Sequence, residues 1–182
     1  MNLVNIEKIL GYEFADSQNL IKALTHPSMH RKSKKIHMTF EKLEFLGDRV
    51  LGLCLSTILY KKYTNEDEAI LAIRLAHLAS TSSLVDVAKT SKLINEFYLP
   101  HDEIEHGASS VADMVESTLA AVFLDGGLDS AIKVVNKLFG KKLDQDINRE
   151  KDAKSKLQEY SQSINAGLPI YTVQNINGHS TI

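Results

Sequence analysis

The chain has 182 residues, of which 43% are hydrophobic and 24% are charged, a balance typical of one well-packed domain with a small appendage. A net charge of −2 excludes the strongly basic composition that usually marks a nucleic-acid-binding protein. The sequence has no apolar run as long as a membrane span and no signal peptide, and its one cysteine excludes an internal disulfide. We therefore expect a cytoplasmic protein with no membrane partner.

Local clusters of charge are the remaining basis for binding a polyanion. The basic candidates are residues 31–35, with residues 141–142 and 149–156 behind them. Short basic runs are more often solvated loops and helix ends than binding sites, so these clusters alone predict little.

The first 140 residues are predicted to form helix after helix. Apolar spacing indicates helices at about residues 4–10 and 20–24, and Pro27 ends the second one. After a basic loop, a long helix is expected over about 40–63, with Leu43, Leu46, Val50, Leu53 and Thr57 on its core face. Shorter helices are expected at about 68–80, 82–89, 110–124 and 128–139. The predicted fold class of this region is all-α.

Two helix boundaries in the second half can be predicted from local signals. The run Asp125-Gly126-Gly127 is a strong helix stop. The helix that ends there is expected to have Ser109 or Ser110, after Gly107, as its N-cap residue. No stretch of the first 140 residues alternates cleanly enough to predict a strand.

The composition changes near residue 144. A charged, apolar-poor stretch suits a linker and is followed by a predicted helix at 153–163, a strand at 168–176 and the hairpin signal Asn177-Gly178. One helix, one strand and a turn cannot bury a core, so this tail is predicted to be the start of an incomplete α+β domain. The expected boundaries are a domain at 1–147, a linker at 148–152 and a domain fragment at 153–182.

Acidic side chains recur at helical spacing in two places. Glu41, Glu44 and Asp48 lie three and four residues apart on one stripe of the long helix, beside its core face. Asp113 and Glu116 form a second such pair. Carboxylates stacked in this way repel one another unless a cation balances them, and oxygen ligands favour Mg²⁺. Two helices that each offer an acidic pair could enclose such a site, although a solvated helix face is the commoner meaning of either pattern alone.

The segment Phe40-Glu-Lys-Leu-Glu-Phe-Leu-Gly-Asp-Arg-Val-Leu51 resembles the signature of the ribonuclease III family, endonucleases that cut double-stranded RNA. Residues 23–28 (Ala-Leu-Thr-His-Pro-Ser) and 112–125 are similar to other parts of the family's nuclease domain. Residues 152–160, followed by Leu-Pro-Ile-Tyr, resemble the start of its double-stranded-RNA-binding domain. The resemblance implies a ribonuclease III-type helical endonuclease domain followed by an incomplete RNA-binding domain.

The resemblance also implies roles for an acidic quartet, by which we mean Glu44, Asp48, Asp113 and Glu116. All four would be metal ligands, and Asp48 and Glu116 would act in catalysis. The implied cofactor is Mg²⁺, with Mn²⁺ as a substitute.

Other positions receive secondary roles from the same resemblance. Glu41 and Glu68 match secondary acidic positions, and Ser155 and Gln158 match residues that contact an RNA minor groove. The family usually has Gly-Asp after the acid at position 68, whereas this chain has Ala69-Ile70, which puts that contact with substrate or partner in doubt.

The implied function is a Mg²⁺-dependent endoribonuclease that acts on double-stranded RNA as a homodimer. Its products would carry 5′ phosphates, 3′ hydroxyls and two-nucleotide 3′ overhangs, and its role would lie in rRNA and mRNA processing. The alternative is a non-catalytic ribonuclease III-like module that binds RNA or a partner. The complete acidic quartet favours the enzyme, because a module that does not cut would be expected to lose one or more of the four.

Two competing sites are disfavoured by the sequence. The pair His101-Asp102 resembles a motif of another metal-dependent phosphohydrolase class, but no partner histidines stand at helical spacing from it. Cys54 lies in an apolar run and is expected to be a buried thiol, not a nucleophile.

Overall fold

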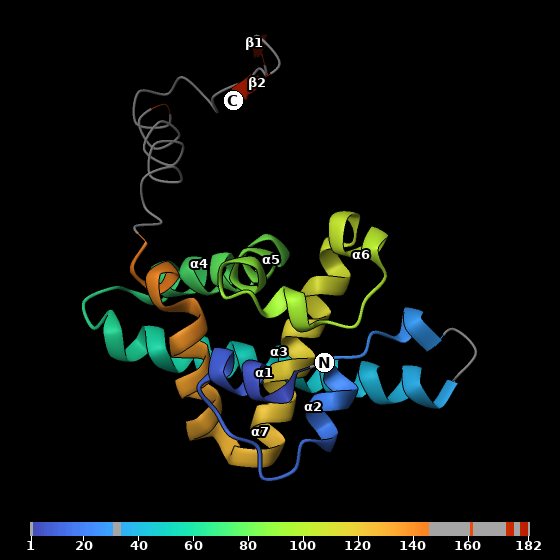
Figure 1. Ribbon diagram of the computed structural model, residues 1–182. Coiled ribbons are helices and arrows are strands. Elements are labelled where there is room, and N and C mark those ends of the chain that lie inside the picture. Colours follow the sequence, from blue (N-terminus) through green and yellow to red (C-terminus); the bar gives the residue numbers. More distant parts are fainter. Residues whose placement is uncertain (1, 31–33, 146–160, 162–173, 177–178, 182) are drawn as a thin grey trace. The chain divides into compact units, whose positions relative to one another are not determined.

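The computed structural model describes residues 2–30, 34–145, 161, 174–176 and 179–181. The chain divides into two units, Met1–Asp144 and Gln145–Ile182. The first unit is built from helices, which confirms the predicted all-α class for this part of the chain (Figure 1). Its elements are α1 (Leu3–Leu10), α2 (Gln18–Ala23), η1 (Pro27–His30), α3 (Lys34–Lys62), α4 (Glu68–Leu78), α5 (Thr81–Thr90), η2 (Leu93–Glu96), α6 (His101–His106), α7 (Ala108–Phe139) and η3 (Gly140–Asp144).

Helices α3 and α7 form the centre of this unit and pack against each other more extensively than any other pair (Figure 1). Helices α2, α5 and α6 pack on α7, and α4 packs on α3. The shared core includes the fully buried side chains of Leu51, Leu55, Met114 and Leu119. The other helices therefore hold the α3–α7 crossing in place by burying its apolar sides.

The core face of α3 differs from the prediction over its second half. Leu43 and Val50 are buried as expected, but Leu53 is 51% exposed, and Cys54 is buried instead. The Thr57 hydroxyl bonds to the backbone oxygen of Leu53 at 2.7 Å. The physical reason is the helical period: at 3.6 residues per turn the eleventh residue after Leu43, not the tenth, returns to the same face.

The structure differs from the sequence-based predictions in three details around α7. Gly127, with φ 73° and ψ −173°, breaks the helix where the stop at residues 125–127 was predicted, although helix continues on both sides. The predicted cap at Ser109 or Ser110 is wrong, because α7 begins at Ala108 with Gly107 as its N-cap residue and no side-chain cap. Helix α6 occupies a segment for which no helix was predicted.

Asp125 anchors the loop between α1 and α2 to the break in α7. Its carboxylate accepts hydrogen bonds from the Tyr12 hydroxyl at 2.7 Å and from the backbone N–H groups of Ala15 and Asp16, each at 2.9 Å. A Cβ at Gly126 would lie 2.2 Å from the Tyr12 hydroxyl, so this contact requires glycine there. The loop between α1 and α2 is thus anchored to the middle of α7.

Three polar contacts hold η3 against the end of α3 and the middle of α5. The Tyr63 hydroxyl donates to the backbone oxygen of Leu143 at 2.5 Å, and Lys142 pairs with Asp86 at 2.7 Å. Lys62 forms an ion pair with Asp144. The buried side chain of Leu143 completes this attachment.

In the second unit, β1 (Gln174–Ile176) pairs antiparallel with β2 (His179–Thr181). Ile176 lies opposite His179, so two residues connect the strands, which confirms the hairpin predicted at Asn177-Gly178. The strand β2 was not predicted. Most of the predicted helix at 153–163, and the first part of the predicted strand, lie outside the described residues.

No helix in the described ranges is by itself long and apolar enough to cross a membrane. The bent pair of α4 and α5 passes that test on length and composition alone.

Candidate active site

The site begins with a close approach between two backbones. Gly47 of α3 lies against Glu116 of α7, so that a Cβ at position 47 would stand 2.0 Å from the Glu116 backbone oxygen and 2.3 Å from its carbonyl carbon. Any side chain here would force the helices apart. Because Gly47 has no side chain, the backbones of α3 and α7 can lie in contact, and each of these helices carries carboxylates.

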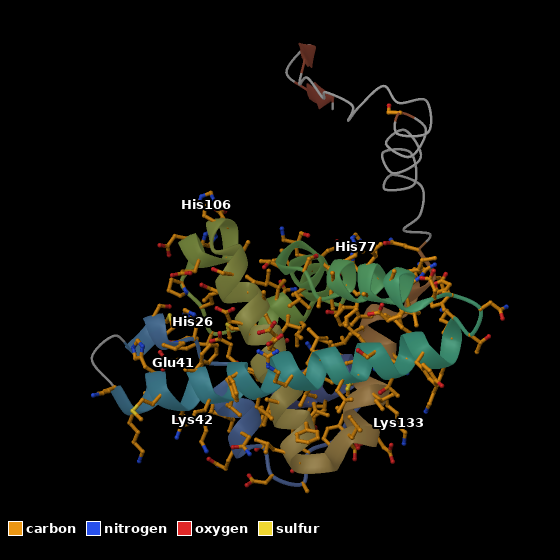
Figure 2. All side chains as sticks on the ribbon, turned by 180° about the vertical axis from the view of Figure 1, so that it is seen from behind. His26, Glu41, Lys42, His77, His106 and Lys133 are labelled. Carbon is orange, nitrogen blue, oxygen red and sulfur yellow. The ribbon has the colours of Figure 1, made fainter. Side chains whose placement is uncertain are left out.

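This crossing brings the acidic quartet together. Glu44 and Asp48 flank Gly47 on α3, and Asp113 and Glu116 lie on the facing part of α7. All four side chains are half-buried, as the position of the stripe beside the core face predicts. Glu41 belongs to the same stripe but is exposed, because it lies a turn before the crossing (Figure 2).

The electrostatics identify the quartet as one coupled group. Burial raises the pKa of Glu116 to about 7, and the negative charges of Asp48, Asp113 and Glu44 add to this, against a smaller opposing effect of Arg49. Burial and the charge of Glu44 raise the pKa of Asp113 to about 6. Burial, with Glu41 and Asp48, also raises the pKa of Glu44. Half-buried carboxylates without a cation nearby resist ionisation for this reason.

Arg49 supplies positive charge at the rim of the quartet. It lies 3.3 Å from Asp48, and its side chain is 74% exposed. Within the described part of the chain, no residue donates a hydrogen bond to Glu44, Asp113 or Glu116. The described residues therefore balance the negative charge of the quartet only in part, through Arg49.

The donor set fits a hard divalent cation in chemistry. Four carboxylates on two helices offer only oxygen ligands, which Mg²⁺ and Mn²⁺ prefer, and a cation would relieve the repulsion that raises the three pKa values. Among the described residues, however, no three His, Cys, Asp or Glu side chains already stand close enough to hold a metal ion. The side chains of the quartet would therefore have to change rotamer to close on a cation.

The remaining predicted site residues lie apart from the quartet or outside the description. Glu68 is exposed in the first turn of α4. Ser155 and Gln158 fall outside the described residues. His101 is exposed and lies 3.7 Å from Glu105 within α6, so the His101-Asp102 pair forms no histidine cluster in the described part of the chain.

Two other residues are explained by their surroundings. Burial raises the pKa of the Cys54 thiol to about 11, which makes it unreactive as expected. The departure at Ala69-Ile70 falls in the first turn of α4, where the Asp67 side chain accepts a hydrogen bond from the Ile70 N–H at 2.9 Å. That turn is closed by an ordinary N-cap without the usual Gly-Asp.

Sequence reasoning missed the role of Gly47. A glycine inside a long helix, between Glu44 and Asp48, is the available signal, because glycine is unfavourable in a helix interior unless another backbone approaches it.

Comparison with known proteins gives one consistent family. A family model described as "Ribonuclease-III-like" matches residues 16–143. The chain is 36% identical over 178 residues to Ribonuclease 3 of Rhizobium meliloti, which covers 95% of this chain and 73% of that protein. It is 37% identical over 185 residues to Ribonuclease 3 of Bordetella avium, covering 98% and 71% of the two chains.

Solved structures give the same result for the fold. The nuclease domain of ribonuclease III from Campylobacter jejuni is 31% identical and superimposes with a TM-score of 0.68, covering 80% of this chain and 98% of that one. A second structure of that domain, with a TM-score of 0.67 and coverage of 77% and 97%, is described for flexibility in a region involved in its dimer formation.

Proposed function

Because this chain belongs to the ribonuclease III family and is thus an endoribonuclease, we propose that it hydrolyses phosphodiester bonds of double-stranded RNA with the help of Mg²⁺ or Mn²⁺. The products are duplexes with 5′ phosphates, 3′ hydroxyls and two-nucleotide 3′ overhangs, and the cellular role is rRNA and mRNA processing. The observation that carries the proposal is the convergence of two carboxylate pairs where Gly47 lets α3 and α7 touch.

The acidic quartet holds the cation in this proposal. Glu44 and Asp113, with raised pKa values, bind it once ionised, and Asp48 and Glu116 complete its ligands. When bound, a divalent cation supplies charge stabilisation for the leaving 3′ oxygen and favours ionisation of the attacking water.

Glu116 is the member of the quartet on which the charges of the other three act. Without a cation, burial and these charges raise its pKa to about 7, and a bound cation would lower this pKa again. Asp48 lies closer to solvent, beside Arg49, and its charge acts directly on Glu116. We therefore assign Glu116, supported by Asp48, to catalysis.

A homodimer is proposed to present two such sites to the two strands of a duplex. The surface that supports this is an apolar stripe along α3, defined by Met38, Phe45, Leu53 and Tyr60, which are 47%, 69%, 51% and 75% exposed. Large apolar side chains aligned on one helix face are expected to be covered by a partner. The stripe runs along the helix that carries Glu44 and Asp48, so a two-fold contact here would relate the two sites.

The dimer proposal is tested by weakening this stripe. Phe45→Ser is expected to weaken self-association more than tenfold, because each dimer loses two buried phenyl rings. Val4→Ser is the matched control, since Val4 is 75% exposed but lies on α1, away from the stripe. Sedimentation equilibrium measures both variants, and equal association constants would exclude this surface.

Residues 153–182 are proposed to be the first part of a double-stranded-RNA-binding domain, with Ser155 and Gln158 on the RNA-facing side of its first helix. The antiparallel hairpin of β1 and β2 is compatible with this proposal. Appending a complete domain of this kind should tighten duplex binding and raise activity at moderate salt; unchanged binding would contradict the assignment.

The single cysteine supports a cytoplasmic setting.

Cleavage of a long perfect RNA duplex at low salt, with Mg²⁺ or with EDTA, tests the central proposal. Short duplex products that carry 5′ phosphates and form only with Mg²⁺ are expected on a sizing gel. A duplex that stays intact at RNA concentrations that saturate binding would contradict the proposed reaction and favour a non-catalytic module.

A further inference from the structure

The helix that carries half of the acidic quartet begins without a side-chain cap. Gly107 is the N-cap residue of α7, and no side chain accepts a hydrogen bond from the first N–H groups of this helix. These groups have no partner within the helix and form the positive end of its dipole. Asp113 is the sixth residue of α7, counted from Ala108, so fraying of the start of the helix would displace this carboxylate.

Glu103 of α6 supplies a negative charge at this terminus. Its Oε2 atom accepts a hydrogen bond from the hydroxyl of Ser110, a buried residue in the first turn of α7, at 2.5 Å. A Cβ at Gly107 would stand 2.5 Å from the same oxygen, so the carboxylate lies directly against the start of the helix. A hydrogen bond to an ionised acceptor is stronger than a neutral one, and a negative charge at this end of a helix is favourable.

The same carboxylate also acts on a residue that packs against α3. Its charge opposes the effect of burial on the pKa of His26, which places the two side chains within electrostatic reach. The His26 ring meets Phe40 of α3 edge-on, with centroids 5.3 Å apart, and its Nδ1 atom lies 2.7 Å from the Ser28 hydroxyl. Figure 2 shows His26 between α6, which carries His106, and the part of α3 that carries Glu41.

Glu103 therefore contacts the start of one acidic helix and lies within electrostatic reach of a side chain packed on the other. It does not act on the quartet through its own charge, because the charges that shift the pKa values of Asp113 and Glu116 belong to other residues. Its effect on the quartet has to pass through the placement of the helices.

We propose that Glu103 is a positioning residue for the acidic quartet: by holding Ser110, it fixes the start of α7. Asp113 and Glu116 then keep the spacing to Glu44 and Asp48 that lets the four close on a divalent cation. This inference rests on the proposed function, in which the quartet binds that cation.

The test compares two substitutions of Glu103 with substitutions of its neighbours. Glu103→Ala removes the acceptor and the charge, Glu103→Gln keeps an acceptor for the hydroxyl, and Ser110→Ala removes only the donor. Glu105→Ala is the matched control, because Glu105 lies on the same helix but is exposed and lies only near His101 and His106, at 3.7 and 3.8 Å. The readouts are Mn²⁺ binding to the RNA-free protein by electron paramagnetic resonance and the Mg²⁺ concentration that gives half-maximal cleavage.

Glu103→Ala is expected to weaken Mn²⁺ binding about tenfold and to raise the half-maximal Mg²⁺ concentration by a similar factor, with most of the rate restored at saturating Mg²⁺. Glu103→Gln should recover most of this loss, Ser110→Ala should reproduce part of it, and Glu105→Ala should match the wild type. Melting temperatures measured alongside separate a loss of metal affinity from a general loss of stability.

A lower melting temperature with unchanged Mn²⁺ affinity in Glu103→Ala would overturn the inference and leave Glu103 a stabilising residue only. If Glu103→Ala does not fold, Ser110→Ala decides the question, because it removes a single hydroxyl. Wild-type protein that binds no Mn²⁺ and cuts no duplex would overturn the proposed function as well, whereas a normal wild type beside normal variants would overturn this inference alone.

Discussion

Two of the half-buried carboxylates on helix α7, Glu116 and Asp125, lie nine residues apart in opposite surroundings. Burial would raise the pKa of Asp125, but hydrogen bonds from Tyr12 and from the backbone of Asp16 and Ala15 outweigh it, so this pKa is lowered. Burial and three neighbouring carboxylates raise the pKa of Glu116 to about 7. Asp125 accepts three hydrogen bonds, whereas no described residue donates one to Glu116. The difference indicates which acid serves the fold and which one needs a partner from outside the described residues.

The sharpest test of this contrast replaces Glu116 with Gln, which keeps the size of the side chain and removes its charge. Cleavage of an RNA duplex is expected to fall by at least about a hundredfold, because both a ligand and the proposed proton acceptor are lost. The single-turnover rate measures this, with circular dichroism and sedimentation to verify fold and assembly. Unchanged cleavage would remove Glu116 from the mechanism.

The helix crossing can be broken without touching a carboxylate. Gly47→Ala is expected to destabilise the protein by about 2–3 kcal/mol and to reduce cleavage strongly, because its Cβ would collide with the Glu116 backbone. Gly52→Ala is the matched control on the same helix, since nothing lies within 4 Å of its Cβ, and it should be neutral or stabilising by up to about 1 kcal/mol. Urea unfolding distinguishes the two, and equal midpoints would contradict the close approach.

Because Asp125 serves the fold, its loss is expected to reduce stability and to leave the cleavage rate nearly unchanged. Asp125→Ala should lower the free energy of unfolding by about 2 kcal/mol, because the Tyr12 hydroxyl and two backbone N–H groups lose their acceptor. The cleavage rate at a temperature where the variant is folded should stay near that of the wild type. A selective loss of metal affinity in this variant would show that the two acids are not separate in function.

The smallest effect concerns pH. The pKa of Glu116 rises from 4.5 to about 7 on folding, so between these values the folded chain holds a proton that the unfolded chain releases. Stability without a cation should therefore fall as pH rises through this window, by an amount of order 1 kcal/mol after allowance for solvent screening. Thermal melts from pH 5 to 8 measure it. Mg²⁺ should reduce the loss, and Glu116→Gln should flatten the slope above pH 6, where Asp113, with a pKa of about 6, contributes less; an unchanged slope there would assign the effect to other groups.

The sequence predicts the existence of the long helices α3 and α7, although it begins α3 at about residue 40 instead of Lys34 and divides α7 into two helices. It fails for α6, because the six residues from His101 to His106 are nearly all polar and give no periodic signal. Leu53 was misplaced because a small error in helical period accumulates along a helix of 29 residues. Periodicity therefore predicts the presence of a long helix more reliably than it predicts which residues face the core near the far end of that helix.

The candidate site, too, could be predicted from the sequence only in part. Spacing alone places Glu44 with Asp48, and Asp113 with Glu116, on single helix faces. It does not show that the two faces meet, because that depends on Gly47 and on a crossing between segments more than sixty residues apart. The contact between Glu103 and Ser110 was equally out of reach, since it depends on the unpredicted helix α6.

The attachment of η3 has a mechanical consequence. Tyr63 holds Leu143, Asp86 holds Lys142, and Lys62 holds Asp144. A pull on the chain beyond Asp144 therefore has to break three consecutive attachments, at Asp144, Leu143 and Lys142, before it loosens the end of the helical unit. Tension is thus taken up by the end of α3 and by α5 before it can reach the crossing at Gly47 and its carboxylates.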